Sequence, residues 1–371
     1  MLNSLSIFCN FRQKLQILFF FVIQLIISIL EFATLGLIPI FIIFLTNPNE
    51  AYDKINDIND FLSKSFIEIN LLQSISSIFI LMSALLLIKN FLQIIQIFIE
   101  AYLVKVLNYQ TINKVFNFNL NQSLTKIISN KSSDYLRNIN SESTQSIGYL
   151  ISQFMILKES ILLFSIIFII YFNNKFIALV VCVFILLMFI MIYFTLNKKL
   201  LKKGKAAFNS KSNLIQGITN YLGIFKEIKI YKLERFFTNY FQKNLRIKLK
   251  NDMFKYIVSK IARNLFEVIF ILIIIFLMLL AKGASLDIKE YLPLLGLVIV
   301  AFMRILPTMT SINSSYAGLV YNKISFQTIK KTLINYSKIS QNKSDDINFI
   351  KIKNFKKLKF SFLNFKYGNK T

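Results

Sequence analysis

The stretch Ala301–Tyr316, AFMRILPTMTSINSSY, decides how the rest of the chain is interpreted. It lies within a long apolar segment, yet it contains Arg304, Pro307 and a run of Thr and Ser residues. A simple membrane anchor needs none of these, because a charge inside a bilayer costs about 2.5–3.5 kcal/mol on insertion scales. The stretch therefore predicts a membrane helix with a polar side, the last of its kind before a basic C-terminal segment.

The 371 residues are 55% hydrophobic, and the apolar residues recur in long blocks along the whole chain. A helix needs about 20 apolar residues to cross the ~30 Å hydrocarbon layer of a bilayer. The expected fold is therefore an all-α polytopic membrane protein with six transmembrane helices. The six spans are expected near residues 15–45, 71–107, 147–172, 175–196, 254–280 and 291–315.

The formal net charge of +26 raises the question of nucleic-acid binding. Heavy use of Ile, Asn, Lys and Phe along the whole chain indicates a general composition bias instead, and the charges gather in particular loops. The two cysteines, Cys9 and Cys182, form neither a zinc pattern nor a disulfide framework, and the chain has no histidine. We expect neither a nucleic-acid partner nor a metal.

The placement of charges predicts the orientation of the spans. The loop between the first two spans is rich in Asp and Glu, whereas Asn197–Arg263 holds 17 Lys and Arg and few acidic residues. Because cytoplasmic loops collect Lys and Arg, both termini are expected in the cytoplasm. Apolar residues at helical spacing in the acidic loop predict a short external amphipathic helix: Ile55, Ile58, Phe61 and Leu62.

Two long segments on the cytoplasmic side, Asn108–Ser146 and Asn197–Met253, contain little Gly or Pro. They predict helices that leave the membrane, turn and return. At ~1.5 Å per residue, the second span would be about 55 Å long, well beyond the bilayer. Its lower part, which carries Lys89, Glu100 and Lys105, is therefore expected to project into water.

Six spans with two helical cytoplasmic excursions resemble the membrane domain of a type IV ABC exporter. The sequence SSDYLRNINSESTQSIGYL (Ser132–Leu150) is similar to the first excursion of that family, and QGITNYLGIFKEIKIYKLERFF (Gln216–Phe237) to the second. Ala301–Tyr316 resembles span six of the lipid-linked-oligosaccharide flippase (PglK-like) branch, and EFATLGLIPIFI (Glu31–Ile42) resembles its span one. The resemblance covers nearly the whole chain and makes residues 1–340 the transmembrane domain.

This resemblance implies a function and a set of partners. The chain would be the membrane half of a homodimeric, ATP-driven exporter in the bacterial inner membrane. It would translocate a lipid-linked oligosaccharide or a similar amphipathic substrate. An ABC ATPase domain would contact two coupling turns, formed by Ser132, Ser133, Asp134, Tyr135 and Leu136 and by Asn220, Tyr221, Leu222, Gly223 and Ile224.

Residues 341–371 resemble a linker and the first strands of an ABC ATPase domain, with Tyr367 at the position that stacks on adenine. The ending GNKT, Gly368–Thr371, is not the phosphate-binding motif G-x-x-x-x-G-K-[ST], and no Walker B strand or signature loop occurs. We therefore expect no ATP hydrolysis by this chain alone. ATP and Mg²⁺ would act only through an ATPase domain that is supplied in trans, has been lost by truncation, or lies outside this sequence.

Two interpretations of Glu31 and Arg304 are open, since both fall near the middle of their spans. In the first, they line a substrate cavity together with Pro307 and Ser311, and Arg304 meets an anionic head group. In the second, they neutralise each other as a buried pair that joins the two helices. Pro307 removes a backbone donor and is expected to kink its helix.

Two other functions fit the same sequence. One is an ABC exporter of a peptide or hydrophobic small molecule, although a chain without histidine cannot contain a Cys–His processing protease. The other is an inactive half-transporter or an ATP-independent membrane scaffold. The recruitment of an ATPase domain would distinguish the transporters from the scaffold.

Overall fold

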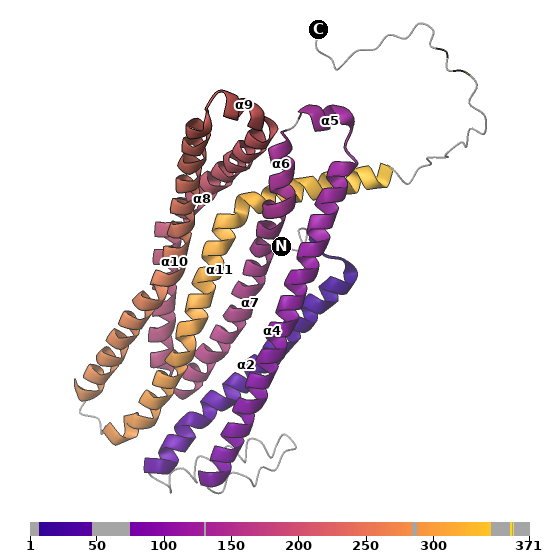
Figure 1. Ribbon diagram of the computed structural model, residues 1–371. Coiled ribbons are helices and arrows are strands. Elements are labelled where there is room, and N and C mark those ends of the chain that lie inside the picture. The colour runs from indigo at the N-terminus through magenta and orange to yellow at the C-terminus, as the bar shows by residue number, and fades with distance from the viewer. Residues whose placement is uncertain are drawn as a thin grey trace.

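The computed structural model describes residues 7–46, 75–129, 131–283 and 288–342, together with Lys357 and Lys359. Over these residues the chain is almost entirely helical and contains no strand (Figure 1). The all-α class predicted from the sequence is therefore confirmed. The external helix expected at residues 55–62 lies outside the described residues and stays a prediction. The same holds for Tyr367.

Long helices dominate the described part of the chain. Those of 31 residues or more are α2 (Phe11–Thr46), α4 (Ile75–Leu120), α7 (Ser143–Asn173), α8 (Lys175–Gly223), α10 (Glu234–Gly283) and α11 (Ile288–Asn342). Short elements gather at one end of the bundle: α5 (Leu124–Ser129), α6 (Ser132–Arg137), the π-helix η2 (Asn138–Glu142) and α9 (Phe225–Ile230). The long helices pack as three neighbouring pairs, α2 with α4, α7 with α11 and α8 with α10, and the α7–α11 pair lies between the other two (Figure 1).

Membrane-spanning character is clear for part of this bundle. Among the described residues, four helical stretches are long and apolar enough to cross a membrane: Phe11–Phe44, Phe79–Leu120, Ser132–Asn173 and Gly296–Ser337. These four support a membrane-embedded protein. Crossing of the membrane by α8 and α10 as well, which would make six spans, belongs to the proposal below.

The helices predicted to continue beyond their apolar blocks do so. The blocks 175–196 and 254–280 are parts of α8 and α10, which have 49 and 50 residues. At ~1.5 Å per residue each helix is about 75 Å long, more than twice the ~30 Å hydrocarbon thickness. In Figure 1 the α8–α10 pair reaches the end of the bundle where α9 lies.

A single asparagine produces the tight connection between α7 and α8. Asn174 is extended, and its side-chain Oδ1 accepts hydrogen bonds from the backbone N–H groups of Phe176 and Ile177 at 3.0 and 3.1 Å. An N-cap of this kind satisfies amides that have no partner in the first helical turn. The chain therefore reverses within one residue, and α7 and α8 remain neighbours.

Two large apolar clusters hold the bundle together. One joins α7, α8, α10 and α11 and includes Phe302, whose ring stacks on that of Phe270 at 3.7 Å. The other joins α2, α4, α7 and α11, where the Phe326 ring stacks between those of Phe8 and Tyr149. Since α7 and α11 contribute to both, this pair of helices is the structural centre of the described bundle.

α8 and α11 approach each other closely at Gly204, and this contact gives a first prediction. A Cβ atom at Gly204 would lie 2.5 Å from the backbone oxygen of Tyr321. We expect Gly204→Ala to lower the free energy of unfolding by about 1–3 kcal/mol, the usual cost of overpacking. Because the chain has no tryptophan, unfolding is best followed by the reaction of the buried Cys9 with a thiol-reactive fluorophore.

Gly36→Ala is the matched control for Gly204→Ala, because no atom lies within 4 Å of a Cβ built at Gly36. Alanine is favoured over glycine in a helix by about 0.5–1 kcal/mol. This variant should therefore unfold at the wild-type temperature or slightly above it. Equal losses in both variants would contradict the close helix contact at Gly204.

Candidate functional site

A polar cavity of about 360 Å³ lies among α2, α4, α7 and α11. The four cavity residues expected from the sequence, Glu31, Arg304, Pro307 and Ser311, all line it. Thr308, from the Thr and Ser run of Ala301–Tyr316, lines it too. The remaining polar lining consists of side chains that were not expected from the sequence: Gln24, Gln93, Gln96, Lys158 and Glu159.

Glu31 is the centre of a buried ion-pair network at one wall of this cavity. Its Oε1 lies 2.9 Å from Nε of Arg304, and its Oε2 lies 2.7 Å from Nζ of Lys89. The side chains of Glu31 and Lys89 are 1% and 0% exposed, whereas that of Arg304 is 39% exposed. The carboxylate therefore ties α2 to both α4 and α11, and Arg304 is the member of the network that faces open space.

The two interpretations of Glu31 and Arg304 turn out to be compatible. The residues form a pair, as the second interpretation expected, and both also line the cavity, as the first expected. The guanidinium uses its Nε for Glu31. No other ion pair or side-chain hydrogen bond of Arg304 occurs within the described part of the chain. Its terminal nitrogens can therefore donate to a bound anion.

The expectation that Lys89 projects into water was wrong. Lys89 is fully buried and faces α2, where it forms an ion pair with Glu31. The physical reason is that a buried carboxylate between α2 and α4 requires a cation from the facing helix. The sequence around Lys89 does not show its partner, because Glu31 lies 58 residues earlier in the chain.

Glutamine side chains continue the polar lining from the ion-pair network along α2 and α4. Gln96 Nε2 donates to Oε1 of Gln24 at 2.9 Å, and the same nitrogen lies 3.5 Å from the backbone oxygen of Phe20. Both glutamines are buried. Hydrogen bonds of this kind between helices are found where buried polar groups need a partner.

Ser311 differs in its hydrogen-bond partner from three other hydroxyl residues of Ala301–Tyr316. Thr308, Thr310 and Ser314 donate to backbone carbonyls of their own helix, which satisfies them locally. Ser311 Oγ instead donates across the cavity to Oε1 of Glu159 on α7 at 3.2 Å. Ser311 therefore orients the Glu159 carboxylate.

The predicted effect of Pro307 concerns the backbone of the same helix. α11 continues as one helix through Pro307.

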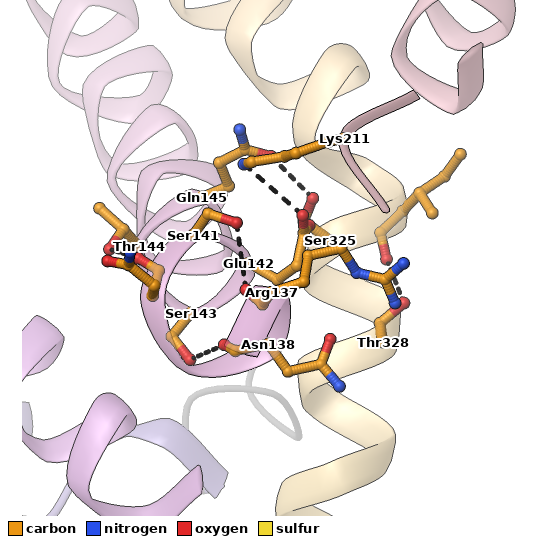
Figure 2. Close-up of polar contacts among 12 residues, drawn as sticks. Arg137, Asn138, Ser141, Glu142, Ser143, Thr144, Gln145, Lys211, Ser325 and Thr328 are labelled. Carbon is orange, nitrogen blue, oxygen red and sulfur yellow. Dashed lines mark hydrogen bonds and ion pairs between the residues drawn. The ribbon is translucent and has the colours of Figure 1, made fainter. Parts of the chain in front are cut away.

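A second polar cluster lies at the π-helix η2, outside the cavity (Figure 2). Glu142 is fully buried there, and its Oε1 lies 3.6 Å from Nζ of Lys211 on α8. Ser325 on α11 donates to Oε1 of the neighbouring Gln145 at 2.9 Å. Burial lowers the pKa of Lys211 below its ordinary value, and the Glu142 carboxylate opposes this shift. The cluster joins α7, α8 and α11 where they leave the apolar core.

The first predicted coupling turn is the helix α6, and it contacts α8. Ser212 Oγ donates to Oδ1 of Asp134 at 3.2 Å, and the Arg137 guanidinium lies 4.3 Å from the centre of the Phe208 ring. Arg137 also pairs with Asp134 at 3.1 Å. Of the five predicted residues, Ser132 and Leu136 are exposed, Ser133 is buried, and Asp134 and Tyr135 are half-buried.

The second predicted coupling turn, Asn220–Ile224, is the C-terminal end of α8, and all five of its residues are exposed. Large apolar side chains continue the exposed surface into the following segment: Phe225, Ile230, Tyr231, Leu233 and Phe236. We call Leu222, at the end of α8, together with these five residues that follow it in the chain, the α8 tip. Exposed apolar side chains gathered in one short segment are typical of an interaction site in a soluble environment.

Comparison with protein-family models gives no match, and neither does comparison with curated proteins. The functional argument therefore depends on the geometry and on the sequence resemblance given above. The sequence contained one further signal of the cavity, because Lys158 and Glu159 lie inside the apolar block 147–172. An ionisable residue within a span indicates a functional site by default. Gln24, Gln96 and Glu142 gave no comparable signal.

Proposed function

We propose that the chain is the membrane-spanning half of an ATP-driven ABC exporter or flippase. In this proposal all six long helices cross the bacterial inner membrane with both termini in the cytoplasm, and two copies enclose a translocation path. The substrate is a lipid-linked oligosaccharide or a similar amphipathic molecule. ATP binding and hydrolysis are supplied by an ABC ATPase domain.

The observation that carries this proposal is the polar cavity. Glu31, Lys89 and Arg304 place one carboxylate and two cations inside an otherwise apolar helical bundle. A structural pair would need only one cation, and it would not need to line open space. Arg304 is instead held at Nε and partly exposed toward the cavity, which is the arrangement that an anionic head group requires.

The distal end of the bundle supports the ATPase part of the proposal. The α8 tip exposes apolar side chains at the end of a helix about 75 Å long, too far from the membrane for lipid to cover them. The neighbouring α6 contacts α8, so that a force on either element would reach both. A protein partner with an apolar groove fits this surface.

The proposal is tested by co-expressing the tagged chain with each ABC ATPase of its own genome. Inverted membrane vesicles should then accumulate a lipid-linked oligosaccharide probe in an ATP-dependent manner. Leu222→Asp should abolish both ATPase recruitment and accumulation, because it places a charge in the apolar α8 tip. The exposed Leu249 of α10 provides the control, since Leu249→Asp should retain both. A chain that neither dimerises nor recruits any ATPase would instead be an ATP-independent scaffold.

Arg304 gives a more specific prediction for the same assay. Arg304→Lys should fold and reduce transport, because a point charge replaces a bidentate donor. Arg304→Gln should reduce transport further. The pair between Glu31 and Lys89 remains in both variants, so that the thermal stability should stay close to that of the wild type. Normal transport by both folded variants would exclude a substrate role for Arg304.

A further inference from the structure

The cavity is lined by charged groups of both signs that keep hydrogen-bonding capacity beyond their contacts within the described protein. Arg304 uses only Nε for Glu31. Across the cavity, neither Lys158 nor Glu159 forms an ion pair with any residue of the described ranges. Lys158 lies 5.9 Å from the centre of the Phe20 ring, and Glu159 accepts one hydrogen bond, from Ser311. Two cationic groups, Arg304 and Lys158, and one anionic group, Glu159, therefore line the same space.

The distance between the Arg304 guanidinium and the Glu159 carboxylate suits one extended ligand. Arg304 and Ser311 lie seven residues apart on α11, which corresponds to about 10 Å along the helix axis. Since Ser311 Oγ contacts the Glu159 carboxylate at 3.2 Å, the anionic group lies about two helical turns from the guanidinium. A ligand that reaches from one to the other needs opposite charges at two points of its head group.

A purely anionic head group fits this cavity less well. Arg304 would bind its phosphate, but Glu159 would face the same negative charge, and like charges at close range in a poorly solvated site are costly. A ligand that carries an ammonium removes this conflict, because the ammonium can donate to the Glu159 carboxylate. Among the charged residues that line the cavity, Arg304 and Lys158 balance Glu31 and Glu159, so a head group with one charge of each sign suits it.

We propose that the amphipathic substrate has a zwitterionic head group, with a phosphate bound by the terminal nitrogens of Arg304 and an ammonium bound by Glu159. Ser311 is a positioning residue that holds the Glu159 carboxylate toward the cavity. This inference rests on the proposed function, because it names the head-group chemistry of the substrate that the same cavity would take. It adds Glu159, which has no role in the binding of a simple anion.

The test is calorimetric titration of the purified full chain in detergent with short-chain lipids. Dihexanoyl phosphatidylethanolamine carries both charges, and dihexanoyl phosphatidylglycerol carries only the phosphate. We expect the wild type to bind the ethanolamine lipid more tightly. Glu159→Gln should weaken that binding about tenfold, which corresponds to the loss of one charged hydrogen bond. The same variant should leave the binding of the glycerol lipid unchanged or strengthen it.

Three further variants complete the experiment. Arg304→Gln should weaken the binding of both lipids. Ser311→Ala, which keeps every charge, should weaken only the binding of the ethanolamine lipid and by less than Glu159→Gln. Glu267→Gln removes one negative charge from the exposed face of α10, outside the cavity, and should change neither affinity. Gel filtration and the protection of Cys9 establish that each variant is folded.

The outcomes separate this inference from the proposed function. If both lipids bind equally and Glu159→Gln changes neither, the zwitterionic head group is wrong, while an effect of Arg304→Gln leaves the proposed function standing. If neither lipid binds and Arg304→Gln has no effect on transport, the proposed function fails as well. Free phosphoethanolamine is a third probe, and binding as tight as that of the lipid would replace the amphiphile by a soluble zwitterion.

Discussion

Replacing Glu31 by glutamine is expected to destabilise the chain more than any other single change in the cavity. The variant leaves the fully buried Lys89 without a counter-charge, next to the guanidinium of Arg304. Removal of one partner from a buried ion pair costs about 3–5 kcal/mol. The midpoint of thermal unfolding, followed by the exposure of Cys9 in detergent, should therefore fall strongly.

The other members of the network should rank below Glu31. Lys89→Met leaves Glu31 paired with Arg304, so we expect a smaller loss of about 1 kcal/mol. The double variant Glu31→Gln/Lys89→Met removes the unpaired buried charge and should recover most of the stability lost by Glu31→Gln alone. Additive losses in the double variant would contradict a direct interaction between Glu31 and Lys89.

Lys211→Met should have the second large effect, in the cytoplasmic extension of the proposed transporter. The variant leaves the buried Glu142 carboxylate without a cation within the described structure. We expect a loss of about 3–5 kcal/mol, again the cost of an uncompensated buried charge. The change should be local, with faster amide hydrogen exchange in η2 and in the facing turns of α8.

Two variants test the cause of that loss. Glu142→Gln/Lys211→Met should restore most of the hydrogen-exchange protection, because no unpaired charge remains. Lys229→Met breaks the exposed pair with Glu234, in which the side chains are 58% and 44% exposed, and should change nothing measurable. If Lys211→Met behaves like Lys229→Met, the contact between Glu142 and Lys211 does not stabilise the folded chain.

The sequence predicted the features that depend on local pattern. Long apolar blocks indicate helices, and the bounds of α2 and α7 differ from the predicted spans by a few residues. Charges within an apolar block stand out for the same reason, so Glu31 and Arg304 could be assigned to a cavity. The structure places both on one cavity wall. Their roles in transport stay predictions.

The features that could not be predicted depend on contacts between distant segments. Lys89 was assigned to water because only the packing of α4 against α2 shows which side of the helix is buried. Glu142 and Lys211 are 69 residues apart, and each has the polar neighbours of an ordinary exposed residue. Nothing local marks them as partners. The sequence shows which charged residues would be costly to bury, whereas the fold shows which residue of opposite charge offsets that cost.

The close contact between Gly204 and Tyr321 constrains how any movement can pass along the molecule. Any side chain at position 204 would push the two backbones apart, so the glycine keeps α8 and α11 in direct contact at this point. Gly204 lies 19 residues from the end of α8, and Tyr321 lies 17 residues from Arg304. At ~1.5 Å per residue the two arms are each about 25–30 Å long. The contact therefore lies about midway between the α8 tip and Arg304, where a change in the packing of α8 on α11 would be felt by both.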